Sequence, residues 1–264
     1  MSTAVRLQRE SDYWDAAHTG EVRTPARRFY VIGGARDRRY RDWVMEAGAG
    51  SGRRALELGA CLAGAGLDLA RSGTLVTGID ISPATVDQAR RNADALGLGD
   101  RMDLRVMNAE VLDFPDGTFD VACASAVIHH LDLDRAVPEI VRVLRPDGQA
   151  IFAEPLGHNP LINRYRRRTP AMRTPDEHPL TMGDLDLLGR HFGTVEAAWF
   201  HLSSLAAVPL AGTGAFEPVV AGLERLDRAL FRLPALRRAA WYVVLRLAHP
   251  RAAGSSPTEP PREP

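Results

Sequence analysis

Short apolar segments recur along this chain and alternate with stretches in which apolar residues follow helical spacing. The apolar segments cover residues 54–58, 74–79, 103–107, 119–124, 149–153, 195–201 and 241–247. Segments of this length, bounded by Gly, Pro or charged residues, are typical of buried strands. Their alternation with helical stretches predicts an α/β fold built on a doubly wound parallel sheet.

Capping residues indicate where several helices begin. Ser82-Pro83 and Asn159-Pro160 each place an N-cap residue before a proline in the first turn, and Thr181 is a further N-cap candidate. Gly97 then ends the helix that Ser82 opens. The helices that we expect cover residues 38–47, 63–72, 82–96, 134–144, 160–168 and 182–191.

Composition divides the chain into five segments. The boundaries that we predict are 1–53 for an N-terminal helical cap, 54–202 for the α/β core, 203–238 for a helical lid insert, 239–250 for the last strand of the core and 251–264 for a disordered tail. The tail is rich in Pro, Ser and Glu, which cannot bury enough apolar surface to fold.

Charge and composition exclude several classes of function. The 33 basic and 33 acidic residues balance, so no net charge favours nucleic acid or an anionic membrane. Every basic residue other than His is Arg. The absence of Lys excludes a Schiff-base lysine and a P-loop lysine, and with them pyridoxal enzymes and P-loop NTPases. The two cysteines, Cys61 and Cys123, lie in apolar stretches, and we expect both to be reduced.

No targeting segment is visible in the chain. The first eleven residues are polar and lack the apolar region of a signal peptide, and no apolar run is long enough to span a membrane. A cytoplasmic protein is therefore expected.

Leu56-Glu57-Leu58-Gly59 is the chemical centre of the pattern. It joins an expected strand to a helix through a glycine turn, and Asp80 ends the next strand 21 residues later. A turn without bulky side chains brings backbone N–H groups close to a ligand. An acid at the next strand end can accept hydrogen bonds from ribose hydroxyls. The stretch predicts a nucleotide-like cofactor.

Five motifs, in order, resemble those of class I S-adenosylmethionine-dependent methyltransferases. They are Glu57-Leu58-Gly59; Val76 to Pro83; Asn108-Ala109-Glu110 with Phe114-Pro115; Phe119-Asp120-Val121 through His129-His130-Leu131; and Arg142 to Gly148. The resemblance covers residues 56–247. It implies S-adenosylmethionine as cofactor and a Rossmann-like seven-stranded sheet with an antiparallel last strand, a helical N-terminal cap and a helical insert before the last strand.

The resemblance also implies which residues bind the cofactor. Gly59, Ala60 and Cys61 would line the methionine part, with Glu57 in the same motif. Asp80 would hold the ribose and Ile81 would pack on the adenine. The remaining expected contacts are Asn108, Ala109 and Glu110 at the adenine edge, Ala124 and Ser125 below the sulfonium, and Tyr13, Tyr30 or Arg36 from the cap.

Two departures from the family pattern bear on the cofactor. The family usually has glycine at the positions of Cys61 and Ala63, and those side chains resist a positive φ. Asn108 replaces the usual Asp near the adenine amine. Its amide oxygen can still accept a hydrogen bond from that amine, so this change is conservative.

The candidates for chemistry on an acceptor follow the fourth and fifth strands. His129 could act as a general base, whereas His130 has a structural interpretation. Glu154 could orient a substrate or form a salt bridge. His158 could contact an acceptor, and the Arg residues of 164–173 are expected to pair with Asp176 and Glu177. No tight ligand spacing is present, so no metal site is predicted.

The insert at 203–238 is apolar, which favours an apolar small-molecule acceptor; it could instead only cover the sheet or join copies of a homo-oligomer. We therefore expect methyl transfer to an O or C atom of a bacterial secondary metabolite. Three alternatives stay open at this stage. They are a nicotinamide dehydrogenase with a damaged glycine motif, a non-catalytic binding protein, and a protein that uses bound S-adenosylmethionine to steer a cyclisation.

Overall fold

The computed structural model describes residues 3–19, 29–59, 64–170, 174 and 176–251. Seven strands form one sheet in the order β3-β2-β1-β4-β5-β7-β6. The strands are β1 (Arg54–Leu58), β2 (Leu75–Asp80), β3 (Met102–Val106), β4 (Phe119–Ser125), β5 (Leu144–Pro155), β6 (Phe192–Phe200) and β7 (Tyr242–Pro250). The first five are parallel, and β7 runs antiparallel to both β5 and β6. The predicted fold class is confirmed.

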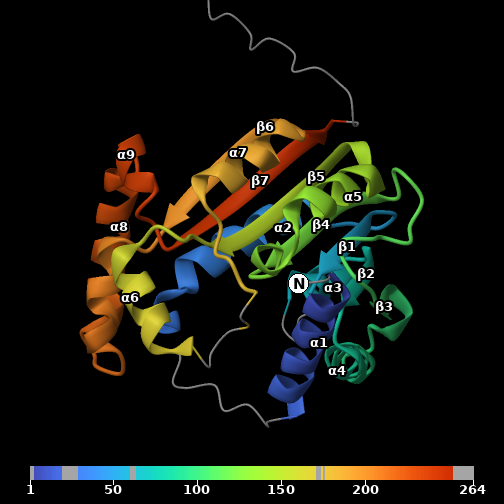
Figure 1. The fold of residues 1–264 in the computed structure, drawn as a ribbon, viewed down its shortest axis with the longest axis horizontal. Coiled ribbons are helices and arrows are strands. Elements are labelled where there is room, and N and C mark those ends of the chain that lie inside the picture. Colours follow the sequence, from blue (N-terminus) through green and yellow to red (C-terminus); the bar gives the residue numbers. More distant parts are fainter. Residues whose placement is uncertain (1–2, 20–28, 60–63, 171–173, 175, 252–264) are drawn as a thin grey trace, which may run out of the picture.

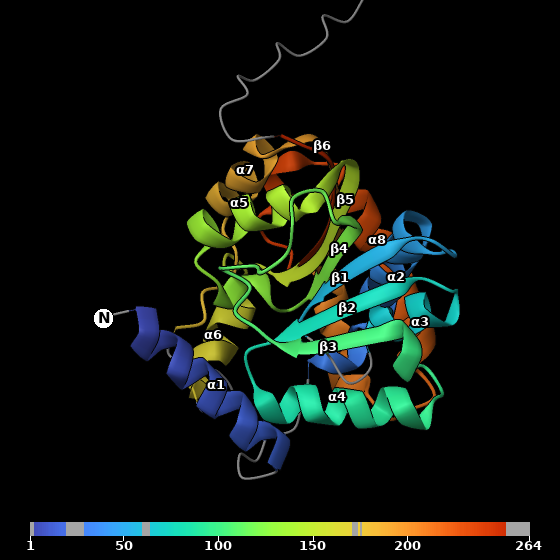
Figure 2. The same cartoon turned by 90° about the vertical axis from the view of Figure 1, so that its right-hand side faces the viewer.

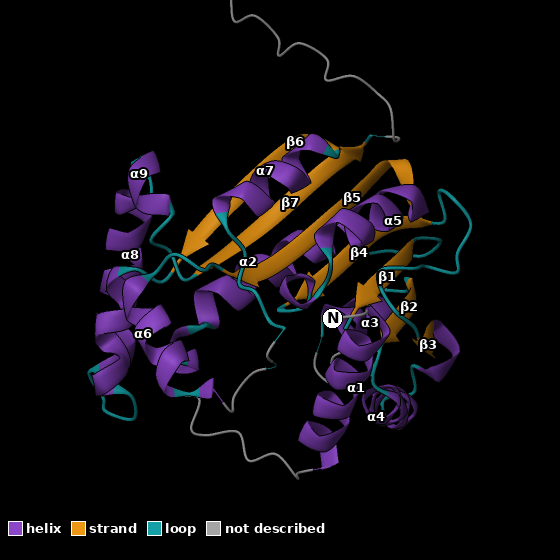
Figure 3. Ribbon diagram, viewed as in Figure 1, coloured by secondary structure: helices purple, strands orange, loops and turns teal. Residues whose placement is uncertain are grey.

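Helices cover both faces of the sheet (Figures 1 and 3). The α-helices are α1 (Thr3–Thr19), α2 (Gly34–Gly48), α3 (Ala65–Arg71), α4 (Pro83–Ala95), α5 (Leu133–Val143), α6 (Pro160–Arg168), α7 (Met182–Arg190), α8 (Phe216–Leu230) and α9 (Pro234–Arg237). The 3-10 turns used below are η1 (Tyr30–Ile32), η3 (Ile128–His130) and η5 (Ser203–Leu210). None of the described helices is both long enough and apolar enough to cross a bilayer.

Alternation along the strands divides the core into two layers. Leu56 and Phe152 lie in the cluster that packs against α5 and α7, whereas Ala55 and Ile151 lie in the cluster that packs against α2 and α3. The central strands β1, β4 and β5 therefore bury apolar side chains on both faces, as expected for a parallel sheet covered by helices. This rigid platform fixes the positions of the loops at its carboxyl edge.

The predicted caps are confirmed. The Ser82 hydroxyl accepts from the Thr85 amide, and the Asn159 side chain caps α6. Thr181 forms a capping box with Asp184 at the start of α7. These local contacts were predictable because a cap lies within three residues of its partner.

Two local predictions need correction. The fifth strand was predicted at residues 149–153, but β5 begins at Leu144, and residues 145–148 form a bulge inside it. Its pairing with β4 shifts between Phe119↔Leu144 and Val121↔Gln149. The second correction concerns the predicted cap of residues 1–53, which contains a long first helix, α1, that no sequence signal had delimited. It lies beside α4, across the carboxyl edge of the sheet (Figure 2).

Candidate functional site

Gly59 turns the chain immediately after β1. Its φ is +71°, a conformation that favours glycine. A β-carbon at this position would also collide with the side chain of Val127, which follows β4. Glycine is therefore required here for both conformation and space. Ala60, Cys61 and Ala63, on which other cofactor predictions fell, lie outside the described residues.

Glu57 supports this turn from beneath. Its carboxylate is buried and accepts a hydrogen bond of 3.1 Å from the Gly66 amide. A β-carbon on Gly64 or Gly66 would collide with that carboxylate. Burial raises the pKa of Glu57 to about 7, although the hydrogen bond from Gly66 works in the opposite direction. The predicted cofactor contact is thus better described as support for the start of α3.

Asp80 lies half-buried at the end of β2, where a ribose-binding acid was predicted. One carboxylate oxygen accepts from the Ser82 amide at 2.9 Å, which fixes the side chain beside the strand end. The carbonyl of Ile81 accepts from the Ser11 hydroxyl of α1 at 3.2 Å. Asp15 of α1 also contacts the Ser82 hydroxyl. Helix α1 therefore covers the segment that follows β2.

The segment after β3 divides into two roles. The Asn108 side-chain oxygen accepts from the Glu110 amide at 3.0 Å and closes a local turn, while Ala109 is buried beside it. The second lone pair of that oxygen is still suited to an adenine amine. Glu110 differs from the prediction, because its buried carboxylate pairs with Arg6 of α1 and accepts from the Asp132 amide. It anchors α1.

The end of β4 brings the backbone into a sharp turn. Ala124 is fully buried and Ser125 is half-buried, which is compatible with the predicted floor of the cofactor site. Ala126 follows with φ +57°, and its amide donates to the Ala153 carbonyl at 2.8 Å. A non-glycine residue in this region is uncommon and often marks a functional turn. The turn at Ala126 directs the chain toward His129.

His129 and Glu154 form a buried pair at the ends of β4 and β5. The His129 Nδ1 lies 2.6 Å from a Glu154 carboxylate oxygen. The other Glu154 oxygen accepts from the amides of Val127 and Ile128 at 3.0 and 3.1 Å. An ionised carboxylate only accepts hydrogen bonds, so the His129 Nδ1 must be the donor. The Nε2 lone pair of a neutral ring is then left for other chemistry.

The two adjacent histidines have opposite electrostatics. Burial lowers the pKa of His129 and outweighs the effect of Glu154, which keeps the ring neutral at pH 7. Burial also acts to lower the pKa of His130, but the neighbouring Glu10 carboxylate outweighs it and the pKa is raised. The pKa of Glu10 falls for the reciprocal reason, despite its own burial. His130 and Glu10 therefore form an ion pair, whereas His129 can act as a base or a ligand.

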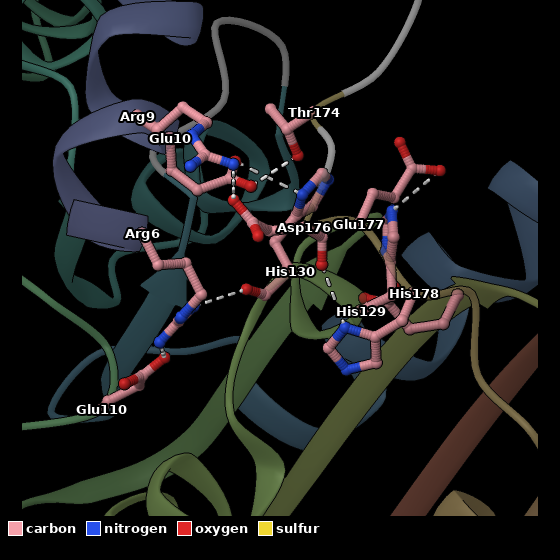
Figure 4. Close-up of polar contacts among 11 residues, drawn as sticks. Arg6, Arg9, Glu10, Glu110, His129, His130, Thr174, Asp176, Glu177 and His178 are labelled. Atoms are coloured by element: carbon pink, nitrogen blue, oxygen red, sulfur yellow. Dashed lines mark hydrogen bonds and ion pairs between the residues drawn. The ribbon is translucent and has the colours of Figure 1, made fainter. Parts of the chain in front are cut away.

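Side chains from three distant segments meet at this point (Figure 4). Glu10 of α1 accepts from the Thr174 hydroxyl, and its other oxygen lies 3.4 Å from the His130 Nδ1. Glu177 places a carboxylate oxygen 4.0 Å from the His129 Nε2. None of these partners is close to His129 or His130 in sequence, so no motif could have revealed the cluster.

Two polar residues of the segment after β5 have partners that the sequence did not indicate, and the contact of His158 with an acceptor stays a prediction. His158 was a candidate for acceptor chemistry, but its Nε2 accepts from the Met182 amide at 3.2 Å and so caps α7. Asp176 was expected to pair with the Arg-rich helix, but the structure pairs it with Arg9 of α1 at 3.1 Å. A cap and an ion pair formed by partners 24 and 167 residues away are invisible in local spacing.

A second polar group lies where β7 begins. The Arg36 guanidinium stacks over the Tyr242 ring at 4.2 Å, and Tyr30 packs edge-on against Trp241 at 5.3 Å. Burial raises the pKa of Tyr242 and lowers that of His201 to about 3, so both side chains are neutral at pH 7. Tyr30 and Arg36, predicted for the cofactor, thus lie beside the first residues of β7. His201 and Tyr242 were missed because neither belongs to a motif.

A family model described as "Methyltransferase domain" matches residues 46–152. The central part of the chain is therefore similar to methyltransferase domains. The matched region contains the Gly59 turn, Asp80, Asn108 and the β4 end, which explains why the motifs pointed to this family and not to nicotinamide dehydrogenases.

Curated relatives of this chain match over part of their length. A phosphatidylethanolamine N-methyltransferase of Cereibacter sphaeroides is 38% identical over 38% of this chain and 50% of the relative. A 27-O-demethylrifamycin SV methyltransferase of Amycolatopsis mediterranei is 28% identical over 54% and 49%. The chain spans about half of the length of these two relatives.

Solved structures extend the likeness of the fold over most of the chain. A geranyl diphosphate C-methyltransferase from Streptomyces coelicolor covers 92% of this chain and 98% of its own, with 14% identity and a TM-score of 0.62. The cyclase SpnF covers 80% and 81%, with 23% identity and a TM-score of 0.54. At these identities the likeness establishes the fold.

S-adenosylmethionine is the cofactor that the match to methyltransferase domains implies, and the residues of this chain fit it. The Gly59 turn leaves backbone exposed where a methionine part approaches, because a side chain there is excluded. Asp80 and Asn108 present oxygen acceptors at the next two strand ends, suited to ribose hydroxyls and an adenine amine. The individual contacts stay predictions.

Proposed function

We propose that this methyltransferase transfers a methyl group from S-adenosylmethionine to an O or C atom of an apolar small molecule, in bacterial secondary metabolism. The observation that carries the acceptor class is the apolar cluster at the carboxyl edge, next to β7. It joins η1, α6, η5 and α8 through buried residues that include Ile32, Ile162, Leu205, Val208 and Trp241.

The position of this cluster supports its role as a lid. Helices α6, α8 and α9 gather at the end of the molecule where β5 ends and β7 begins (Figure 1). In parallel α/β sheets, ligands bind at the carboxyl ends of the strands. An apolar wall beside that edge favours an apolar acceptor over a peptide or nucleic acid. A homo-oligomer and the compartment of the protein stay open predictions.

The mechanism requires little acid–base chemistry. Bound S-adenosylmethionine supplies an electrophilic methyl group on its sulfonium. The chain would hold the cofactor at Gly59 and Asp80, exclude water with α1 and the apolar lid, and align the acceptor atom. For a hydroxyl acceptor, His129 is the proposed general base, because Glu154 orients its ring and leaves Nε2 unprotonated.

Isotope labelling tests this proposal. The full-length protein is incubated with methyl-labelled S-adenosylmethionine and extracts of small molecules from bacteria that make secondary metabolites, and products are separated by mass spectrometry. We expect one labelled apolar molecule with the wild type and none with Asp80→Ala. Label in protein or nucleic acid alone would overturn the acceptor class. Binding of S-adenosylhomocysteine, measured by calorimetry, tests the cofactor site separately.

A cyclisation steered by bound cofactor is the second candidate. The fold likeness to SpnF, a structure named as a cyclase, is the observation behind it. A substrate whose rings change while no label is transferred would favour this candidate. Tight cofactor binding with no turnover of any small molecule would instead favour a non-catalytic binding protein.

A further inference from the structure

The cluster below helix α1 contains the donor set of a metal site. His129, His130 and Glu177 each offer one ligand atom, and these atoms lie within 4.8 Å of one another. Figure 4 shows the side chains converging from η3 and from the segment that follows Thr174. His129 is fully buried and the other two are half-buried, so the donors lie inside the protein and not on a solvated acidic surface.

Glu154 prepares His129 as a ligand. A metal-binding histidine usually donates its other ring N–H to a carboxylate, which fixes the tautomer and raises the basicity of the ligating nitrogen. The 2.6 Å contact between Glu154 and the His129 Nδ1 has this form, and the Nε2 faces Glu177 at 4.0 Å. The two amide hydrogen bonds to Glu154 hold the carboxylate itself in place.

Two buried polar atoms at the same place provide a further observation. The Glu10 Oε2 and the His130 Nδ1 form an ion pair at 3.4 Å, but neither atom makes a hydrogen bond of normal geometry among the described residues. Buried polar atoms held only by a long contact are rare and often mark an absent ion or water. Glu10 is thus available as a fourth ligand from α1.

The charge of the cluster also favours a cation. Among the described residues, the ion pairs of Glu10, Glu154 and Glu177 are all with the two histidines. Three carboxylates thus face two imidazole rings. A divalent ion bound between them would add positive charge beside these carboxylates.

We propose that His129, His130 and Glu177 bind one divalent first-row transition-metal ion, with Glu10 completing the site. Imidazole and carboxylate ligands suit Zn²⁺, and the same set binds Co²⁺ as a spectroscopic substitute. Bonds of about 2.1 Å place tetrahedral ligands about 3.4 Å apart, so the donors must approach one another by about 1 Å. Glu177, half-buried in a loop, can supply this movement.

This inference does not depend on methyl transfer, but it changes the role of one residue. The His129 Nε2 cannot both bind a metal and accept an acceptor proton. A bound ion would instead tie α1, η3 and the segment after Thr174 together and lower the pKa of a hydroxyl coordinated to it. The ion would therefore replace His129 as the means of activating a hydroxyl acceptor.

Metal binding to the full-length chain tests the proposal. The protein is stripped with a chelator, dialysed and titrated with Co²⁺ under calorimetry and visible absorption, and Zn²⁺ is then added as competitor. We expect one Co²⁺ per chain, with the strong visible bands of a low-coordinate nitrogen and oxygen site, displaced by Zn²⁺. Glu177→Gln and His130→Asn should each weaken Co²⁺ binding by at least about 10-fold.

His178→Asn is the matched control. His178 is adjacent to Glu177 and exposed, and its ring contacts the Asp176 carbonyl instead of the cluster. This variant should bind Co²⁺ like the wild type. Thermal unfolding shows that each variant is folded, and calorimetry with S-adenosylhomocysteine tests the cofactor site without bearing on the metal. Absence of stoichiometric Co²⁺ binding, or binding unchanged in Glu177→Gln, would overturn the metal site and restore His129 as the base.

Discussion

The two edges of the site differ in how far apart along the sequence their interacting residues lie. We call the ends of β1, β2 and β3 the cofactor edge and the ends of β4 and β5, with the start of β7, the acceptor edge. On the cofactor edge, polar groups find partners two residues away, as Asp80 does with Ser82 and Asn108 with Glu110. Such contacts are encoded in short motifs.

The acceptor edge depends on distant partners. Glu10 contacts Thr174, 164 residues along the chain, and the His129–Glu154 pair spans 25 residues. These contacts exist only once the sheet has formed and α1 has docked. The difference shows that the chemistry shared by a family can be recognised from local sequence motifs. The residues that can distinguish its members are brought together only by the tertiary structure.

The largest expected effect falls on the cofactor edge. Gly59→Ala places a β-carbon against Val127 at φ +71°. Backbone strain and overpacking together should lower the affinity for S-adenosylhomocysteine by about 1,000-fold, or about 4 kcal/mol, in calorimetry. Gly97→Ala is the control, because Gly97 has φ +68° but open space around it. Equal affinities in the two variants would show that the collision has no role in cofactor binding.

Glu57→Gln probes the foundation of the same edge. The pKa of Glu57 is about 7 in the folded protein, against 4.5 when unperturbed. Between these values the folded state holds the proton more often than the unfolded state, so stability falls as the pH rises from about 4.5 to 7. The Gln side chain does not titrate in this pH range, so the variant does not lose this stability. Its stability should equal that of the wild type near pH 4.5 and exceed it by about 3 kcal/mol at pH 8 in urea unfolding.

A constant difference across this pH range would contradict the assignment of a protonatable Glu57 beneath the Gly59 turn. The Gln side chain keeps an oxygen for the Gly66 amide, so loss of that hydrogen bond does not complicate the comparison.

Asp80→Ala should have a smaller effect than Gly59→Ala. It removes charge-assisted hydrogen bonds to the ribose and leaves the turn intact, so the affinity for S-adenosylhomocysteine should fall by about 10- to 100-fold. Asp87→Ala on α4 is the control, since Asp87 pairs only with Arg90 in an exposed contact among the described residues. An unchanged affinity in Asp80→Ala would remove the ribose assignment.

The smallest effect is expected where the two edges meet. Arg6→Ala takes the partner from the buried Glu110 carboxylate and should weaken the docking of α1 by about 1–2 kcal/mol, seen as faster hydrogen exchange within residues 3–19. Arg135→Ala removes the other, more exposed partner at 3.6 Å, and should change exchange by less than about 1 kcal/mol. If both variants exchange alike, Glu110 does not anchor the helix.

Sequence patterns predicted the strands and the capped starts of α4, α6 and α7, because strand periodicity and caps are local. The antiparallel last strand was implied by the family resemblance. Sequence patterns also placed Gly59, Asp80 and Asn108 at successive strand ends. They did not indicate the partners of His158, Glu110 and Asp176, which come from other elements. The sequence alone does not show whether a histidine or carboxylate caps a helix, anchors a helix or faces a ligand. Only the packing of the folded chain decides among these roles.

The hairpin formed by β6 and β7 has a consequence for evolution and engineering. Phe200, where β6 ends, is paired with Tyr242, where β7 begins, so the intervening chain leaves and re-enters the sheet at adjacent points. A segment with neighbouring ends behaves as a cassette, because its replacement need not move either strand. Natural lineages and designers alike can therefore exchange residues 203–240 as one unit while the cofactor-binding half of the protein is kept.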